Sequence, residues 1–138
     1  MHTIFITGGT GCIGSVTIYK LLQSKEVGKI VIATRSNNTA PLKLWLDEEL
    51  DPRLELVQLD VADYKAMEEV VTNVNPTHII HLGAYQSPDC SKYHIQGMEI
   101  NTGGTMALFD IAENLPNLQR YVFASSAAVY GMRAMYPN

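Results

Sequence analysis

The length, composition and charge of this chain restrict the classes of protein to which it can belong. Its 138 residues suit one domain of ordinary size, without room for a cofactor domain plus a full substrate domain. Ten Lys and Arg stand against 14 Asp and Glu, and the net charge of −4 is spread without long runs, so nothing favours a nucleic-acid or membrane-surface partner.

The chain begins with an apolar run that leads into glycines. Ile4–Thr7 is continuously apolar, which predicts a parallel strand covered on both faces. The string Thr7-Gly8-Gly9-Thr10-Gly11-Cys12-Ile13-Gly14 follows, and a helix is expected from about Cys12 to Ser24. A strand that breaks into glycines and restarts as a helix is typical of dinucleotide-binding folds, although ordinary turns also show such spacing. A tight turn, close backbone approach to a pyrophosphate and close packing of the helix against the strand are the roles expected of Gly8, Gly11 and Gly14.

Strand-like and helix-like segments then alternate. A second strand over Lys29–Thr34 ends in the polar loop Arg35–Asn38, and Pro41 suits the first turn of a short helix. A third strand is predicted at Leu54–Leu59, and Asp63 can cap the helix after it. Apolar residues at helical spacing in these two helices are Leu42, Trp45 and Leu46, then Met67, Val70, Val71 and Val74.

The second half of the chain continues the alternation. Strand four is predicted at His78–Leu82, a polar loop with Pro88 leads to a long helix near Ile95–Asn114, and strand five is predicted at Arg120–Ala124. We expect the stripe of the long helix to be core, namely Met98, Met106, Leu108 and Ile111. The rhythm predicts an α/β fold of three layers, a Rossmann-type doubly wound parallel sheet that binds ligands at the carboxyl ends of its strands.

The residues after strands two and three concern the adenosine end of a cofactor. No carboxylate follows strand two, where an NAD site places one; Thr34 and Arg35 stand there. A guanidinium can pair with a 2′-phosphate and stack on adenine, which favours NADP over NAD, whereas a solvated loop arginine and a Thr34–ribose hydrogen bond are the alternatives. Asp60, followed by Val61, could accept a hydrogen bond from adenine or cap a turn.

Small residues follow strands four and five. Leu82-Gly83-Ala84-Tyr85-Gln86 lets a chain pass close to a pyrophosphate or ribose. After strand five, Ala124, Ser125 and Ser126 lie where we expect the nicotinamide end of a cofactor.

These segments together resemble the extended short-chain dehydrogenase/reductase superfamily, in its NAD-dependent epimerase/dehydratase group. The glycine string is similar to that superfamily's TGGxGxxG, and Asp60-Val61 to its adenine-contacting pair. Asn101-Thr102-Gly103-Gly104-Thr105 is similar to its N-x-x-GT helix, and Ser125–Gly131 to its SSxxVYG strand end. Four motifs occur in the same order over nearly the whole sequence, so the fold assignment is specific. The resemblance does not single out one enzyme within the superfamily.

The resemblance implies roles for individual residues. Ser126 becomes the catalytic serine, which hydrogen-bonds a substrate hydroxyl or carbonyl, and Asn101 fixes the local architecture or a water. Tyr130 becomes a packing residue beside the site. The cofactor contacts implied are Gly8, Gly11, Cys12, Ile13 and Gly14 for pyrophosphate, Asp60 and Val61 for adenine, and Leu82, Gly83, Ala84 and Gln86 for the middle of the molecule.

One motif of the superfamily is absent from this sequence. Catalysis there needs Tyr-x-x-x-Lys, in which the ammonium lowers the tyrosine pKa. None of the seven tyrosines has a lysine four residues later. We therefore interpret residues 1–138 as an incomplete NAD(P)-binding domain without a substrate domain. The resemblance implies that this domain belongs to an oxidoreductase, epimerase or dehydratase, for which a nucleotide sugar is the commonest substrate. The alternative is a catalytically silent nucleotide-binding or redox-sensing module. A sheet that ends at strand five exposes an edge, through which the chain could self-associate.

Cysteines and histidines add little to the prediction. Two cysteines do not make a disulfide scaffold, so we expect a reducing cytoplasm. Cys12 at a helix start is expected to be a small side chain that faces the cofactor. His78 and His81 should face opposite sides of their strand, and with Cys90 and His94 they lack the spacing of metal ligands, so no metal site is predicted.

Overall fold

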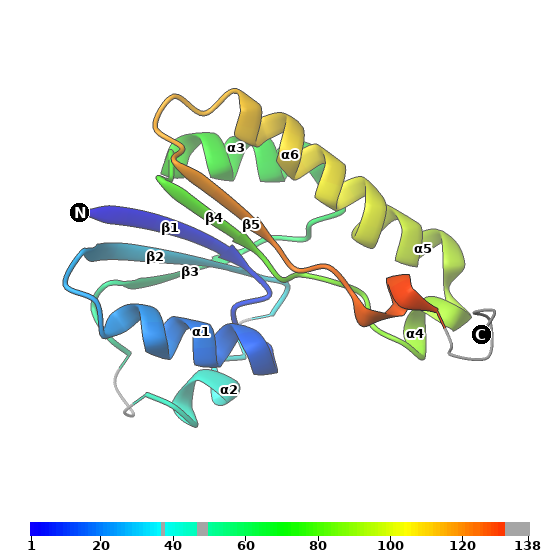
Figure 1. Ribbon diagram of the computed structural model, residues 1–138, viewed down its shortest axis with the longest axis horizontal. Helices are drawn as coiled ribbons and strands as arrows, with labels where there is room; N and C mark the ends of the chain where they lie inside the picture. The colour runs from blue at the N-terminus through cyan, green and yellow to red at the C-terminus, as the bar shows by residue number, and fades with distance from the viewer. Residues whose placement is uncertain (37, 47–49, 132–138) are drawn as a thin grey trace.

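One parallel sheet of five strands organises the molecule, in the order β3-β2-β1-β4-β5 (Figure 1). The computed structural model describes residues 1–36, 38–46 and 50–131, so Asn37 of the predicted polar loop and Tyr136 lie outside the described residues. The strands are β1 (His2–Thr7), β2 (Val27–Thr34), β3 (Leu54–Gln58), β4 (His78–His81) and β5 (Arg120–Phe123). All five predicted strands are confirmed, within two residues at each end.

The centre of the sheet is buried on both faces. Phe5 and Ile6 of β1 are fully buried although they point to opposite faces, which explains the unbroken apolar pattern of this strand. β1 pairs with β2 on one side and with β4 on the other, and Thr7 stands beside His81 in the second pairing. The strand order therefore reverses between β1 and β4, and this switch point is where open parallel sheets bind ligands.

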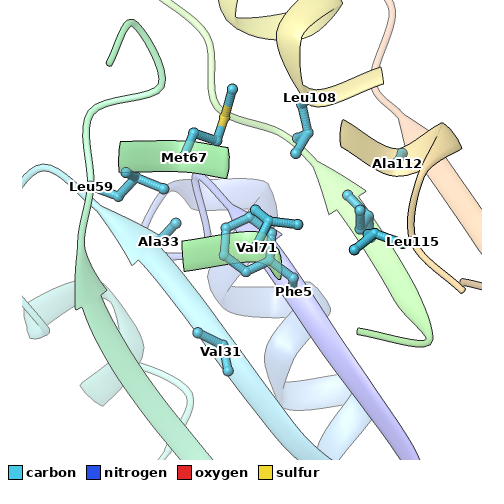
Figure 2. Close-up of a cluster of buried hydrophobic side chains, with 10 residues drawn as sticks. Phe5, Val31, Ala33, Leu59, Met67, Val71, Leu108, Ala112 and Leu115 are labelled. Atoms are coloured by element: carbon cyan, nitrogen blue, oxygen red, sulfur yellow. The ribbon is translucent and has the colours of Figure 1, made fainter. Parts of the chain in front are cut away.

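Helices cover both faces, which confirms the three-layer prediction. The helices α1 (Cys12–Leu22) and α2 (Ala40–Lys43) lie below the sheet in Figure 1, and α3 (Tyr64–Val74) and α6 (Thr105–Glu113) lie above it. Figure 2 shows side chains of α3 and α6 meeting those of the central strands. This upper core contains Phe5, Val31, Ala33, Leu59, Met67, Val71, Ile79, Leu108, Ala112 and Leu115. The lower core contains Ile4, Ile6, Ile18, Leu22, Val27, Ile30, Ile32 and Leu42.

The long helix predicted near Ile95–Asn114 is interrupted. It consists of α5 (His94–Met98), a π-helical segment (Glu99–Gly104) and α6, and a short helix α4 (Asp89–Lys92) precedes it. At Gly104 an added Cβ would lie 2.7 Å from the carbonyl oxygen of Val61, so this segment passes unusually close to the loop after β3. π-helical turns of this kind are frequent at functional sites.

Several exposures differ from the predictions. Leu108 is buried, but Met98 and Met106, expected in the core, are 60% and 56% exposed. Tyr130, expected to pack beside the site, is 72% exposed in a 3₁₀ turn (Ala127–Tyr130) that was not predicted. These expectations are wrong because no described element covers the outer face of α5 and α6 or the turn after β5.

Candidate functional site

The glycine turn between β1 and α1 has a conformation that side chains would prevent. Gly8 has a φ of +69°, in the left-handed region, and its carbonyl accepts the N–H of Gly11 at 3.0 Å. A Cβ on Gly14 would collide with the Gly8 carbonyl oxygen and lie 2.6 Å from the Cα of Gly9. The turn is therefore wound tightly over the first turn of α1, as the sequence predicts.

The start of α1 is open toward solvent. Gly11 is the N-cap and offers no side-chain acceptor to the first N–H groups of the helix, and no acidic residue lies in the first turn. Among the described residues other than its chain neighbours, the one atom within 4 Å of a Cβ added to Gly11 is the Gly8 oxygen at 3.2 Å. Cys12 and Ile13 are exposed beside this opening. Free N–H groups, a helix dipole and open space together fit the pyrophosphate of a dinucleotide.

The loop after β4 lies directly against the glycine turn. A Cβ on Gly8 would stand 2.8 Å from the backbone nitrogen of Gly83, whose N–H donates to the Thr7 hydroxyl at 3.0 Å. Asn101 of the π-helical segment holds the next part of this loop, because its side chain binds both backbone polar groups of Tyr85. The structure thus brings the Leu82–Tyr85 loop against Gly8 on one side and Asn101 on the other, although these three parts lie far apart in the sequence.

A cavity of about 280 Å³ lies at the carboxyl ends of β2 and β3, lined by Arg35, Gln58, Leu59, Asp60, Asp63 and Ala66. Arg35 and Asp60, two predicted contacts of the adenosine end, therefore share one cavity. The Arg35 guanidinium also lies 5.9 Å from the ring centre of Tyr85, within the range of a cation–π contact. This side chain spans from the loop after β2 toward the loop after β4.

Two predicted contacts near this cavity are already engaged by the protein. The Thr34 hydroxyl donates to the carbonyl of Ser36 at 2.8 Å, and the residue is buried. One carboxylate oxygen of Asp60 accepts the N–H of Ala62 at 3.0 Å, as a turn-capping Asp does, while its other oxygen has no recorded partner in the described part of the chain. Val61 packs against the upper core.

Ser126 follows the carboxyl end of β5, and its hydroxyl group can donate a hydrogen bond to a ligand. Its Oγ accepts the N–H of Ala128 at 3.1 Å and so caps the 3₁₀ turn. This bond uses a lone pair and leaves the O–H free to donate to an oxygen atom of a ligand. Ala124, whose N–H donates to the His81 carbonyl at 3.1 Å, and Ser125 continue the same exposed segment.

Sequence reasoning missed the polar groups beneath the site. Thr7, His81 and Thr105 are buried, and they hydrogen-bond one another below the glycine turn. Burial lowers the pKa of His81 from its ordinary value of 6.5 to about 4, so the imidazole is neutral at pH 7. The signal that could have found part of this cluster is that Thr7 and His81 are polar residues at the ends of strands, whereas Thr105 lies in α6.

The histidines of β4 face opposite sides of the sheet, as predicted. His78 stacks edge-on against His2 with ring centres 4.5 Å apart, whereas His81 points into the upper layer. In the ranges that the structure describes, no group of three or more His, Cys, Asp or Glu side chains is arranged to hold a metal ion. No helix in these ranges is both long and apolar enough to span a bilayer.

Comparisons with known proteins agree on one family. The model of the GDP-mannose 4,6 dehydratase family matches residues 5–138. The UDP-glucose 4-epimerase of Lacticaseibacillus casei is 32% identical over 136 residues, which are 98% of this chain and 38% of that protein. Among solved structures, the UDP-glucose-4-epimerase of Stenotrophomonas maltophila with bound NAD and formylated UDP-arabinopyranose has a TM-score of 0.79 at 25% identity, over 100% of this chain and 41% of that one.

A second solved structure gives the same result. The enzyme WbmH of Bordetella bronchiseptica, in complex with NAD+, has a TM-score of 0.78 at 25% identity and covers 96% of this chain and 42% of its own. The chain thus spans about two fifths of the length of each of these three relatives.

Proposed function

Because this chain belongs to the GDP-mannose 4,6 dehydratase family of the extended short-chain dehydrogenases/reductases, we propose that it is the cofactor-binding part of an NAD(P)-dependent epimerase or dehydratase of nucleotide sugars. The observation that carries the proposal is the glycine turn, which leaves the N–H groups of α1 open to an anion at the switch point of the sheet. Relatives named as UDP-glucose 4-epimerases support the substrate class, and neighbours with bound NAD support the cofactor.

Each part of the cofactor has a proposed place. The pyrophosphate binds at Gly8, Gly11, Cys12, Ile13 and Gly14, and the adenosine end enters the cavity that Arg35 and Asp60 share. Leu82, Gly83, Ala84 and Gln86 line the middle, and Ala124 and Ser125 lie toward the nicotinamide. Arg35 can pair with a 2′-phosphate, so NADP is the favoured form, although NAD is the cofactor in the neighbouring structures.

Ser126 is the proposed catalytic residue of this sequence. A bound nicotinamide supplies a hydride acceptor or donor at its reactive carbon. Ser126 donates its free O–H to the substrate oxygen and so orients the carbon that carries it. Since the sequence contains no Tyr-x-x-x-Lys, we assign the proton transfer to none of its residues.

A second candidate function is nucleotide binding without catalysis. The exposed thiol of Cys12 beside the pyrophosphate turn favours a silent or redox-sensing module, in which Cys12 would report on oxidation there. Both cysteines, Cys12 and Cys90, are free thiols, which fits a reducing compartment, and we propose that the protein is cytoplasmic.

Titration calorimetry with NAD and NADP, each oxidised and reduced, tests the proposal. We expect saturable binding, with NADP bound about tenfold more tightly because one paired phosphate is worth roughly 1.4 kcal/mol. Arg35→Ala should remove this preference, while Arg120→Ala, at the opposite end of the sheet, should retain it. Equal affinities in the parent protein would contradict the role of Arg35, and no binding of any form would contradict the proposed function.

We also propose that two copies associate through the outer edge of β5. This strand is the last of the described sheet, and its Val122 and Phe123 are 45% and 46% exposed. Phe109 of α6 lies beside Phe123 and extends the apolar surface. An uncovered edge with apolar side chains is a template for pairing with another strand.

A further inference from the structure

A continuous series of buried hydrogen bonds lies beneath the glycine turn, and the proposed reaction does not use it. It starts at the loop after β4, passes through the side chains of Thr7, His81 and Thr105, and ends at the π-helical segment. These side chains are 0%, 1% and 8% exposed, so water does not compete for their polar atoms. Three separate elements, β1, β4 and α6, each contribute one member.

The donors and acceptors assign a direction to every bond in this series. Thr105 donates its hydroxyl proton to the carbonyl of Asn101 at 2.7 Å, so its Oγ1 can only accept from His81 Nε2, 3.0 Å away. His81 therefore carries its proton on Nε2, and its Nδ1 accepts from the Thr7 hydroxyl at 2.6 Å. Thr7 in turn accepts the N–H of Gly83 at 3.0 Å.

The opposite tautomer leaves partners unmatched. With the proton on Nδ1, Thr7 would accept both from His81 and from Gly83, and its own hydroxyl proton would have no acceptor among the described residues. Thr105 would then donate its hydroxyl proton to Nε2. Its Oγ1 and the carbonyl oxygen of Asn101, 2.7 Å apart, would face each other with no proton between them. A protonated imidazole would also donate from Nδ1 and leave the Thr7 hydroxyl proton without an acceptor among the described residues. Burial of the ring also disfavours this charged form and lowers the pKa of His81.

The two ends of the series meet on the same loop. One end holds the N–H of Gly83, and the other orders Asn101, whose side chain accepts from the Tyr85 N–H at 2.6 Å and donates to its carbonyl at 2.9 Å. The segment from Gly83 to Tyr85 is thus held at both ends by groups that converge on one imidazole. This segment lies against Gly8, so its position sets the width of the opening above the glycine turn.

We propose that His81 is a positioning residue, which as the neutral Nε2–H tautomer fixes the Gly83–Tyr85 loop against the glycine turn and thereby sets the affinity for the dinucleotide. Its effect on affinity rests on the cofactor function proposed above. Its effect on the loop concerns the protein without ligand, so the two can be tested separately.

Paired substitutions test the proposal by separating the two nitrogens. The amide oxygen of His81→Asn replaces the Nδ1 acceptor toward Thr7 and removes the donor toward Thr105. The amide nitrogen of His81→Gln replaces the Nε2 donor toward Thr105, and the acceptor toward Thr7 is lost. Amide hydrogen exchange of the free protein is measured by NMR, which also reports the His81 tautomer, with His94→Gln as the exposed control.

The expected result is a crossover between the variants. His81→Gln should speed exchange of the Gly83 amide about tenfold and leave the Tyr85 amide protected, whereas His81→Asn should do the opposite. A merely structural role would speed both amides alike in both variants, and that result, or an Nδ1–H tautomer in the parent protein, would overturn the proposal. Each variant should also bind NADP roughly tenfold more weakly than the parent. If the parent binds no dinucleotide, the proposed function fails while the exchange experiment still decides the role of His81.

Discussion

The Asn101 side chain binds both backbone polar groups of Tyr85, accepting from its N–H at 2.6 Å and donating to its carbonyl at 2.9 Å. This pairing imitates that of neighbouring strands, and it connects a helix to a loop 16 residues earlier in the chain. The Asn101 amide therefore helps to hold Tyr85 beside Arg35, together with the Cys90 thiol, which also donates to the Tyr85 carbonyl.

Replacement of Asn101 should consequently affect both stability and binding. Asn101→Asp keeps the shape and the acceptor but loses the donor to the Tyr85 carbonyl, so we expect the free energy of unfolding to fall by about 1–3 kcal/mol. Urea unfolding measures this change, and calorimetry should show weaker dinucleotide binding. Asn114→Asp, at an exposed position where the amide donates to the Asp110 carbonyl, is the matched control. Equal effects at both positions would contradict the special role of Asn101.

The glycines of the turn should respond differently to a methyl group. Gly11 has an ordinary φ of −77°, and an added Cβ would meet the Gly8 carbonyl oxygen at 3.2 Å, so Gly11→Ala should lower the melting temperature far less than Gly14→Ala does and weaken dinucleotide binding at least tenfold. Gly14→Ala pushes a Cβ into the backbone of Gly8 and Gly9 and should destabilise the fold by about 2 kcal/mol or more. Thermal unfolding and calorimetry on both variants measure the two effects. If Gly11→Ala binds the dinucleotide as tightly as the parent protein does, the pyrophosphate does not bind at the glycine turn.

Burial of His81 predicts a pH-dependent stability. The unfolded chain binds a proton at this residue below pH 6.5, whereas the folded chain does so only near pH 4, so acid favours unfolding between these values. The hydrogen-bond partners of the ring, Thr7 and Thr105, and its stacking partner Phe123 carry no charge. The free energy of unfolding should therefore fall by on the order of 3 kcal/mol from pH 6.5 to 4.

Urea unfolding at a series of pH values measures this dependence. In His81→Gln the loss over the same range should shrink, because a neutral amide replaces the titrating ring, while His94→Gln should follow the parent protein. An identical loss in His81→Gln would assign the acid sensitivity to the carboxylates instead.

The exposed edge of β5 predicts concentration-dependent self-association. Val122→Lys places a charge on this edge, and charged edge residues oppose strand pairing, so we expect light scattering to report a lower average mass at high concentration. Val129→Lys changes an equally apolar, 70% exposed residue outside the strand and should leave the mass unchanged. A parent protein that remains monomeric at all concentrations would contradict this association.

Local patterns in the sequence were sufficient for the main elements. The unbroken apolar run around Phe5 predicted a strand buried on both faces, and Asp63 was predicted to cap α3, where its carboxylate accepts the Ala66 N–H at 3.0 Å. Gly8 was predicted to form a tight turn and Gly14 to allow close packing of the helix, because a side chain would not fit at these positions. These features depend on residues close together in the chain.

Features that depend on distant contacts were not predicted. The π-helical break at Glu99–Gly104 reflects the approach of Gly104 to the loop after β3, and helical spacing in the sequence carries no trace of it. Arg53 likewise donates to the carbonyls of Leu22, Ser24 and Val27 and so joins α1, β2 and β3 at the far end of the sheet. Met98 and Met106 were assigned to the core because periodicity marks an apolar stripe but not whether another element covers it.

The central claim, a dinucleotide site at the glycine turn, is tested most directly by NMR titration of the isotopically labelled protein with NADP. The account predicts saturable shifts of amide signals that are concentrated at residues 8–14, Arg35, Asp60 and residues 82–86. A second cavity, of about 360 Å³, lies between Tyr19, Trp45 and Arg53 and provides the comparison region within the same spectrum. Shifts confined to that cavity, or no saturable shifts at all, would contradict the claim.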